Sequence, residues 1–347
     1  GFLDYFTNPF AHVGTRTTGN GAGVVLVTPP GWVGELPEPF RAPGRDLAAP
    51  TNWVWIIGRL LIDGAHELAR VHALQDGFHI RTLADWQAGD PGQPRRFDAR
   101  FDARAPFDIG LFLQMAHDAL RDNPAPAADK ALLANATCVG LGLGDDALAE
   151  CLLQPGVREA LERAAATVQA LLDHSAQSLG QATPAAGWSR SMMSLDGGFG
   201  HDHLLRAFIA RQGIGALSPQ EAIYPRCESD DQGRPLTGEH RHVLRFAPGQ
   251  LPPVRAFWSI TLYDSRDYML VDNPIHRYAI GDRTPGLVQD ADGGLSLCLQ
   301  HAPPTGEKER ANWLPTPAGA YFLCLRAYMP EETMLDGRYV LPAPMRR

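Results

Sequence analysis

One apolar stretch of the chain carries hydroxyl groups at every second position. Residues 257–263 read FWSITLY, and in a β-strand alternate side chains point to opposite faces. One face would then carry Ser259, Thr261 and Tyr263, whose hydroxyls can donate and accept hydrogen bonds. The other face holds a tryptophan, an isoleucine and a leucine, which predicts core. The hydroxyl face predicts either the wall of a ligand pocket or an ordinary solvated strand.

Acid–base chemistry at this face would combine Tyr263 with His276 and Arg277. A phenol and an imidazole can transfer protons, and a guanidinium can stabilise developing negative charge. We expect these three residues to be catalytic if the protein is an enzyme. A lyase or a hydrolase is then favoured over an oxidoreductase. The glycines of TRTTGNGAG do not open a helix, and the sequence has neither a GKS or GKT phosphate loop nor a G-x-S-x-G elbow.

A second arginine, Arg326, alternates with the apolar residues of YFLCLRAYMP. A guanidinium within a sheet needs a carboxylate or carbonyl partner, or else it binds an anionic ligand. Two interpretations of Arg277 and Arg326 therefore stay open: structural ion pairs, or a binding site for a carboxylate or a sugar acid. The acidic candidates for such an ion pair are Asp264, Asp267 and Asp272.

The turn that precedes this stretch contains Asn312 and Trp313. A tryptophan can stack on the flat face of a sugar, and an asparagine can donate and accept hydrogen bonds, so both are candidate ligand-binding residues. A tryptophan between turn residues also anchors a loop on the core. The anchoring role is favoured, because one aromatic ring makes no binding platform.

Metal binding is a further hypothesis for the segment GEHRHVLRF. On a strand, His240 and His242 would share one face and present two imidazoles, with a third ligand from Glu239 or His276. Surface histidines are the default interpretation, and otherwise no cofactor is expected. The five cysteines lie far apart, which predicts neither a zinc cluster nor a disulfide framework.

Composition restricts the classes of partner. The chain has 347 residues and a formal net charge of −8, with scattered Lys and Arg, which disfavours nucleic acid. Its apolar runs are shorter than the roughly 20 residues of a membrane span. We expect a small-molecule or oligosaccharide ligand, and a homo-oligomer stays open. The first residues show no signal-peptide pattern, and the sequence starts in a strand-like run without Met, so N-terminal processing stays open. Localisation in the cytoplasm or in the periplasm stays open as well.

The chain has three regions of different character. Residues 1–50 are β-like and rich in turn formers, residues 51–215 are mainly helical by their apolar spacing, and residues 216–347 alternate short strands with turns. The repeat FDARFDAR at 97–104 predicts a loop or linker. Strands that are not interleaved with helices argue against a doubly wound sheet.

Several motifs in order resemble a bacterial family. GGFGHDHLLRAFIARQGIGALSPQEAIYP, LTGEHRHVLRFAPGQLPPVRAFWSITLYD, LVDNPIHRYAIGDR, ANWLPTPAGAYFLCLRAY and LDGRYVLPAP resemble the C-terminal module of the paired domains of unknown function 1254 and 1214. YFTNPFAHVGTRTTGNGAGVVLVTPPGWVGELP is similar to the latter part of the 1254 module. Family members have a further β-rich stretch before it, and a tyrosine-type residue at the position of His203.

The resemblance implies a mainly β fold: two β-sandwich, jelly-roll-like modules, the first incomplete, joined by a helical segment. It implies no reaction, because fold alone does not determine function. We carry two classes of function. One is an enzyme acting on a carbohydrate or a small carboxylated metabolite in a cleft between the modules. The other is a non-catalytic ligand-binding or structural module. Convergence of Tyr263, Arg277 and Arg326 on one pocket would favour the first.

Overall fold

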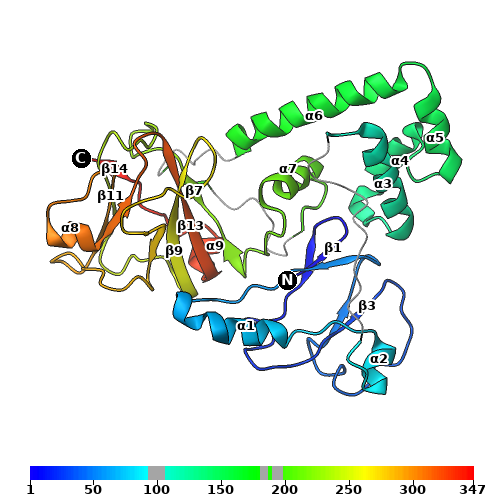
Figure 1. The fold of residues 1–347 in the computed structure, drawn as a ribbon, viewed down its shortest axis with the longest axis horizontal. Coiled ribbons are helices and arrows are strands. Elements are labelled where there is room, and N and C mark those ends of the chain that lie inside the picture. The colour runs from blue at the N-terminus through cyan, green and yellow to red at the C-terminus, as the bar shows by residue number, and fades with distance from the viewer. Residues whose placement is uncertain (93–105, 180–186, 190–197) are drawn as a thin grey trace. The chain divides into compact units, whose positions relative to one another are not determined.

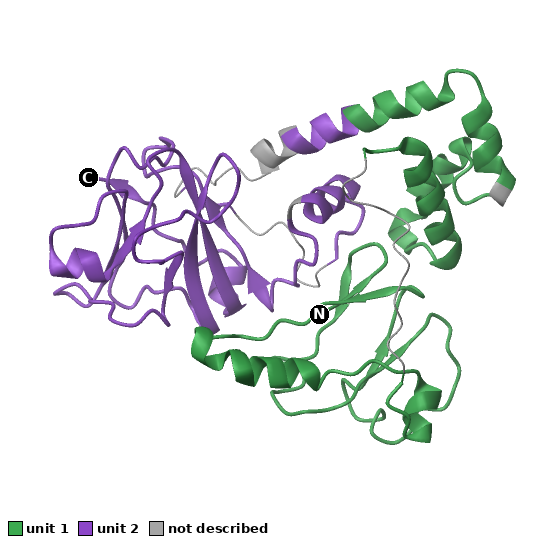
Figure 2. Cartoon of the chain, in the orientation of Figure 1, with its two compact units in different colours: residues 1–166 green, residues 167–347 purple. Residues whose placement is uncertain are grey.

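A computed structural model describes residues 1–92, 106–179, 187–189 and 198–347 of the protein (Figure 1). The chain divides into two compact units, Gly1–Ala166 and Thr167–Arg347 (Figure 2). About 29% of the residues are helical and 21% lie in strands, so the fold is mixed and the expectation of a mainly β chain holds only in part. The repeat at 97–104 lies outside the described residues.

The strands of the first unit are short. An antiparallel sheet has the order β2-β1-β5, and it contains β1 (Phe2–Asp4), β2 (Pro9–Ala11) and β5 (Val54–Ile56). A separate parallel pair joins β3 (Leu26–Thr28) and β4 (Asp46–Ala48). Frequent Gly and Pro between them interrupt regular pairing, which keeps each strand to three residues. Residues 1–50 therefore form pieces of two small sheets, and the described part of this unit shows no sandwich.

The helices occupy the middle of the chain. In order they are η1 (Ala65–Glu67), α1 (Leu68–Asp76), α2 (Leu83–Ala88), α3 (Ile109–Asp122), η2 (Ala127–Asp129), α4 (Lys130–Ala136), η3 (Thr137–Val139), α5 (Asp145–Leu153), α6 (Val157–Leu179) and α7 (His203–Gly213). Side-chain caps begin three of these described helices. Thr82 accepts from the backbone N–H of Asp85 at α2, Asp108 from that of Leu111 at α3, and Asp202 from that of Leu205 at α7. No helix in the described ranges combines the length and apolar character that a membrane crossing requires.

The second unit contains two larger sheets. The five-stranded sheet has the order β10-β9-β13-β6, with β7 also paired to β13; its strands are β6 (Ala222–Ile223), β7 (Arg226–Cys227), β9 (Val254–Asp264), β10 (Ala279–Gly281) and β13 (Tyr321–Pro330). The four-stranded sheet has the order β12-β11-β8-β14; its strands are β8 (His242–Phe246), β11 (Leu295–Gln300), β12 (Trp313–Pro315) and β14 (Met345–Arg346). Two short helices, α8 (Glu307–Ala311) and α9 (Glu332–Leu335), lie between strands in sequence.

One apolar core is shared by these two sheets. The predicted core face of residues 257–263 is confirmed, because Trp258, Ile260 and Leu262 are at most 2% exposed. They belong to the same buried cluster as Leu244 of β8 and Leu297 of β11. Burial of this cluster is the main source of stability for the unit. It also directs every second residue of β9 and β13 to the opposite face of the five-stranded sheet.

Candidate functional site

The face of β9 and β13 that points away from this core is called the outer face below. The two strands are antiparallel neighbours over most of their length (Figure 1). Four cross-strand pairs make up the outer face: Tyr263 with Phe322, Thr261 with Cys324, Ser259 with Arg326, and Phe257 with Tyr328. Two polar or small rows therefore lie between two aromatic rows. This arrangement follows from the two-residue period of the strands and from their register.

Arg326 and Tyr263 meet on the outer face. The guanidinium Nη2 of Arg326 donates a hydrogen bond of 2.5 Å to the phenolic oxygen of Tyr263. Both side chains are half-buried. No aspartate or glutamate among the described residues forms an ion pair with Arg326, so a phenol is its hydrogen-bond partner there. A guanidinium in such a position keeps donors available for an anion.

The carboxylate that follows Tyr263 in sequence, Asp264, forms an ion pair with another arginine, Arg266. Asp264 is 6% exposed and accepts from Arg266 at three positions: the backbone N–H at 2.8 Å, Nε at 3.0 Å and Nη2 at 2.6 Å. These hydrogen bonds hold the pKa of the Asp264 carboxyl below its usual value. Asp267 accepts from the backbone N–H of Met269, and Asp272 is exposed. Asp264 and Asp267 therefore make their contacts within the loop that follows β9.

The aromatic rows are ordered by stacking. The rings of Tyr263 and Phe322 stack with centroids 5.2 Å apart and planes 15° from parallel. The Arg226 guanidinium lies 3.7 Å from the Phe322 centroid, and it also forms a 2.5 Å ion pair with Glu228. At the other end the stacked rings are Phe257 and Tyr328, with centroids 4.4 Å apart.

Between the aromatic rows lies a buried hydroxyl. Thr261 is 1% exposed, and its Oγ1 has no hydrogen-bond partner within the described part of the protein. An unsatisfied buried hydroxyl costs on the order of 1–3 kcal/mol. Ser259, the next residue along the same face, is half-buried beside Arg326. The centre of the outer face thus combines one guanidinium with three hydroxyl-bearing side chains.

The structure places His276 and Arg277 in different contacts from Tyr263. Arg277 Nη1 donates to the backbone oxygens of Ala311 at 2.8 Å and Trp313 at 2.9 Å, and burial lowers the pKa of this guanidinium. His276 is exposed, with a backbone φ of 49°. Among the contacts described, Tyr263 is joined to Arg326 but not to either of these residues. Two of the three groups named for convergence meet, and Arg277 does not join them.

The side-chain polar atoms of Asn312 and Trp313 form hydrogen bonds with backbone groups. Asn312 is 1% exposed; its Oδ1 accepts from the N–H of Val288 at 2.9 Å, and its Nδ2 donates to the oxygens of Val288 at 2.7 Å and Ser296 at 2.9 Å. Trp313 is 2% exposed and donates through Nε1 to the oxygen of Gln300 at 2.8 Å. Both residues therefore act as loop anchors here. Trp313 also lines an open depression of about 630 Å³ with Arg277 and Arg310.

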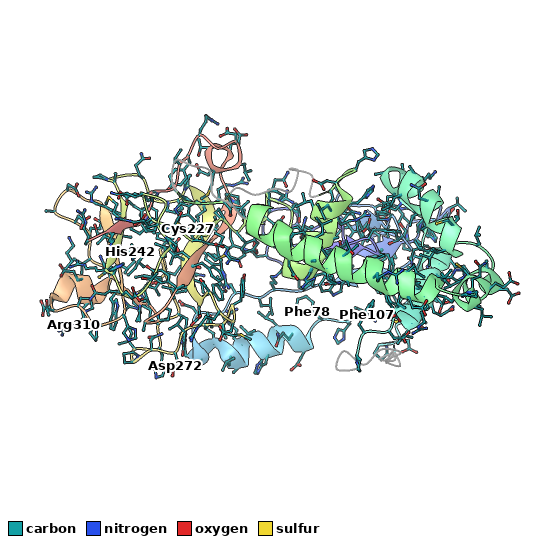
Figure 3. The ribbon with its side chains drawn as sticks, turned by 90° about the horizontal axis from the view of Figure 1, so that it is seen from above. Phe78, Phe107, Cys227, His242, Asp272 and Arg310 are labelled. Atoms are coloured by element: carbon teal, nitrogen blue, oxygen red, sulfur yellow. The ribbon has the colours of Figure 1, made fainter. Side chains whose placement is uncertain are left out.

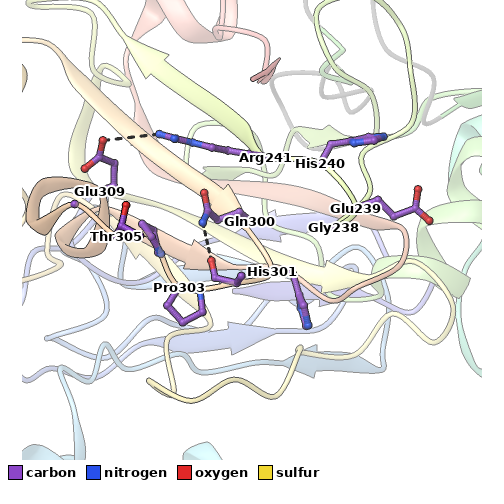
Figure 4. A pocket seen from close by; sticks show the side chains of 12 residues that line it. Gly238, Glu239, His240, Arg241, Gln300, His301, Pro303, Thr305 and Glu309 are labelled. Carbon is purple, nitrogen blue, oxygen red and sulfur yellow. Dashed lines mark hydrogen bonds and ion pairs between the residues drawn. The ribbon is translucent and has the colours of Figure 1, made fainter.

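The two histidines of the metal hypothesis lie in different surroundings. His242 begins β8 and is 1% exposed, whereas His240 precedes the strand and lines an open depression of about 410 Å³. In Figure 4, Arg241 extends toward Glu309 on one side of this depression, and His240 and Glu239 lie on the other. Across the described ranges, no three His, Cys, Asp or Glu side chains are grouped closely enough to hold a metal ion.

Two residues of the outer-face surroundings were missing from the sequence-based prediction. Phe322 could have been found, because the alternation that selected Arg326 also puts it on the same face. Arg226 could not, because β7 is two residues long and carries no periodic signal. Its position over Phe322 depends on the pairing of β7 with β13.

Comparison with known proteins agrees with the order of the motifs. Residues 221–332 match the family model described as protein of unknown function (DUF1214), and residues 1–82 match the family model described as protein of unknown function (DUF1254). The chain therefore belongs to the family in which these two domains are paired, and its DUF1254 match is partial. No curated protein is similar to it in sequence.

Two solved structures show different degrees of similarity. The VPA0106 protein from Vibrio parahaemolyticus is 21% identical with a TM-score of 0.68, over 100% of this chain and 81% of that one, which shows a shared fold. An uncharacterized protein from Burkholderia cenocepacia is 17% identical over 38% of this chain and 31% of that one. Its TM-score of 0.23 does not indicate a shared fold.

Proposed function

We propose that the protein binds a small carboxylated metabolite, a sugar acid among them, at Arg326 on the outer face of the five-stranded sheet. One observation carries the proposal: the half-buried guanidinium of Arg326 donates to the phenol of Tyr263 and forms no ion pair with a carboxylate of the described residues. A planar guanidinium matches the geometry of a carboxylate, and such charge-assisted pairs are the stronger hydrogen bonds.

The neighbours of Arg326 suit this class of ligand. Tyr263 fixes one nitrogen of the guanidinium, which orients the remaining donors. Ser259 offers a hydroxyl on the same face, next to the buried Thr261, whose hydroxyl lacks a partner among the described groups. Aromatic rows at both ends offer apolar surface to a sugar ring. The ligand would thus lie on the second unit, whose two sheets we propose to form a jelly-roll-like sandwich around the shared core.

Catalysis is the second candidate, and Tyr263 is the observation that favours it. A phenol hydrogen-bonded to a guanidinium is a possible proton-transfer group for a lyase or hydrolase. The binding role ranks first, because Arg277 donates to the backbone oxygens of Ala311 and Trp313 and His276 is exposed, so neither adds a described acid–base group beside Tyr263.

A thermal-shift and calorimetric series on the full chain tests the proposal. The probes are acetate, lactate and glucuronate, with neutral glucose as the comparison. A ligand that binds the native state raises its apparent Tm. We expect a rise with carboxylates, and a loss of affinity of about 10- to 100-fold in Arg326→Met, since hydrogen bonds to charged groups contribute about 1.5–3 kcal/mol.

A second arginine, on the neighbouring strand β9, provides the matched control. Arg255 is an exposed residue of β9 with no side-chain hydrogen bond or ion pair to the described residues, so Arg255→Met should retain the ligand response. The Tm of each variant without ligand reports whether the fold survives. The proposal is wrong if glucose raises the Tm as much as the carboxylates do, or if Arg326→Met binds them as tightly as the parent.

A further inference from the structure

Tyr268 has a backbone conformation that tyrosine rarely adopts. Its φ is +62°, in the left-handed region that favours glycine, and its side chain is 52% exposed. A side chain with a Cβ atom is strained there, and such strain persists only where surrounding contacts impose it. A half-exposed tyrosine does little for core packing. The presence of a tyrosine at this position therefore needs an explanation other than fold stability.

The loop after β9 imposes this conformation through several hydrogen bonds. The backbone oxygen of Asp264 accepts from the N–H of Tyr268 at 3.0 Å, and the N–H of Asp264 donates to the oxygen of Met269 at 3.0 Å. Asp267 Oδ1 accepts from the N–H of Met269 at 2.9 Å. The buried Asp264 carboxylate binds Arg266 within the same turn. Together these bonds close the turn at 264–269 and determine where the Tyr268 ring lies.

The ring lies against the aromatic row that contains Tyr263 and Phe322. Its centroid is 5.5 Å from that of Phe322, and the Arg226 guanidinium lies 5.0 Å from it. Phe322 stacks on Tyr263, and Tyr263 accepts the hydrogen bond of Arg326. A continuous series of contacts therefore leads from the exposed ring of Tyr268 to the guanidinium. An anion held beside the Tyr263 hydroxyl would be linked to this aromatic surface through the stacked rings of Tyr263 and Phe322.

We infer that Tyr268 is a specificity-determining residue, which makes the site prefer carboxylates that carry a ring, such as sugar acids and alicyclic or aromatic acids, over short-chain carboxylates. The inference rests on the proposed carboxylate-binding function. Arg326 holds the carboxylate in both classes of ligand. Only a ligand with a ring reaches the exposed surface of Tyr268, where aromatic contacts add affinity.

The strained φ makes a sharp test available. Tyr268→Gly removes the ring and relieves the strain, because glycine adopts positive φ freely, so we expect this relief to offset the lost ring contacts and the Tm to stay close to that of the parent. Loss of binding in this variant is then not a loss of fold. Tyr268→Phe keeps the ring and is the matched control.

Isothermal titration of the full chain with acetate, glucuronate and benzoate measures the preference. We expect Tyr268→Gly to weaken binding of the two ring acids by about 2- to 12-fold, the range typical of one aromatic contact, and to leave acetate unchanged. Tyr268→Phe should keep the parent ratio of affinities, and Arg326→Met should weaken all three acids.

The outcomes separate this inference from the function on which it rests. If the parent binds all three acids equally through Arg326, or if Tyr268→Gly leaves the ratio unchanged, the role of Tyr268 is wrong and carboxylate binding stands. If no acid binds the parent, or if Arg326→Met binds as well as the parent, both proposals are wrong.

Discussion

The imidazole Nδ1 of His242 lies 3.1 Å from the hydroxyl of Tyr321, and each side chain is 1% exposed. His242 is on β8 and Tyr321 is on β13, so the contact joins the two sheets of the second unit inside their shared core. Figure 3 shows His242 and Cys227 among the strands of this unit. Burial lowers the pKa of His242 and raises that of Tyr321, so both groups are held neutral.

The buried histidine predicts a loss of stability at acidic pH. The pKa of His242 is lowered in the folded protein, mainly by burial, whereas the unfolded chain binds the proton near the ordinary value of about 6.5. Stability from this group is complete above that value and falls as the pH decreases through it, by at most about 1.4 kcal/mol per pH unit. Urea unfolding between about pH 8 and pH 5 measures the slope. His242→Asn should reduce the slope; equal slopes in the parent and His242→Asn would contradict the assignment.

Arg277 is predicted to stabilise the fold. Its guanidinium joins the loop before β10 to the backbone oxygens of Ala311 and Trp313, where α8 meets β12. Arg277→Met leaves these oxygens without their donor and should cost about 1–3 kcal/mol of unfolding free energy, as a lost buried hydrogen bond does. Arg255→Met, at an exposed position, should change it by less than about 0.5 kcal/mol. Equal unfolding free energies for the two variants would show that these contacts add nothing.

Close strand packing predicts that Gly281 tolerates no side chain. A Cβ at Gly281 in β10 would collide with the backbone oxygen of Trp258 and lie 2.7 Å from the Cα of Ser259. Because backbone atoms cannot move aside without breaking the ladder, Gly281→Ala should cost about 1–3 kcal/mol. A Cβ added at Gly319 would meet no atom within 4 Å, so Gly319→Ala should be nearly neutral. Thermal or urea unfolding of the two variants compares them directly, and a neutral Gly281→Ala would mean that β10 lies farther from β9.

Thiol reactivity should follow burial. Cys138 is exposed, whereas Cys227 and Cys298 are at most 3% exposed, and burial raises the pKa of Cys227 to about 12. Only the thiolate reacts with alkylating reagents, so Cys227 should be almost inert in the native protein near about pH 8. We expect iodoacetamide followed by mass mapping to label Cys138 first, and Cys227 and Cys298 only after denaturation. Rapid native labelling of Cys227 would show that the core opens locally.

Strand periodicity predicted much of the second unit correctly. Alternation in residues 257–263 and in YFLCLRAYMP identified two strands, and their core faces are buried as expected. Alternation of side chains with a period of two is a local property of the sequence, so it can be recognised without knowledge of the partner strand. It was less useful for the first fifty residues, where strands of three residues are too short to show a period.

The candidate site was predicted only in part, because its contacts are long-range. Arg326 reaches Tyr263 across 63 residues of sequence, and Arg277 reaches the oxygen of Trp313 across 36. His240 and His242 were expected to share a strand face, but β8 begins at His242, so the alternation does not extend to His240. Nothing local distinguishes an arginine that binds a phenol from one that binds two carbonyl oxygens.

By itself the amino-acid sequence determined the family, the strands of the second unit and which face of β9 is apolar, because side-chain type and spacing act along the chain. Tertiary structure decided the partners. The register of β9 and β13 brought Arg326 to Tyr263, and the turn at 264–269 brought Tyr268 to Phe322. Register and turn closure depend on backbone hydrogen bonds between distant residues, and those bonds form only when the chain is folded.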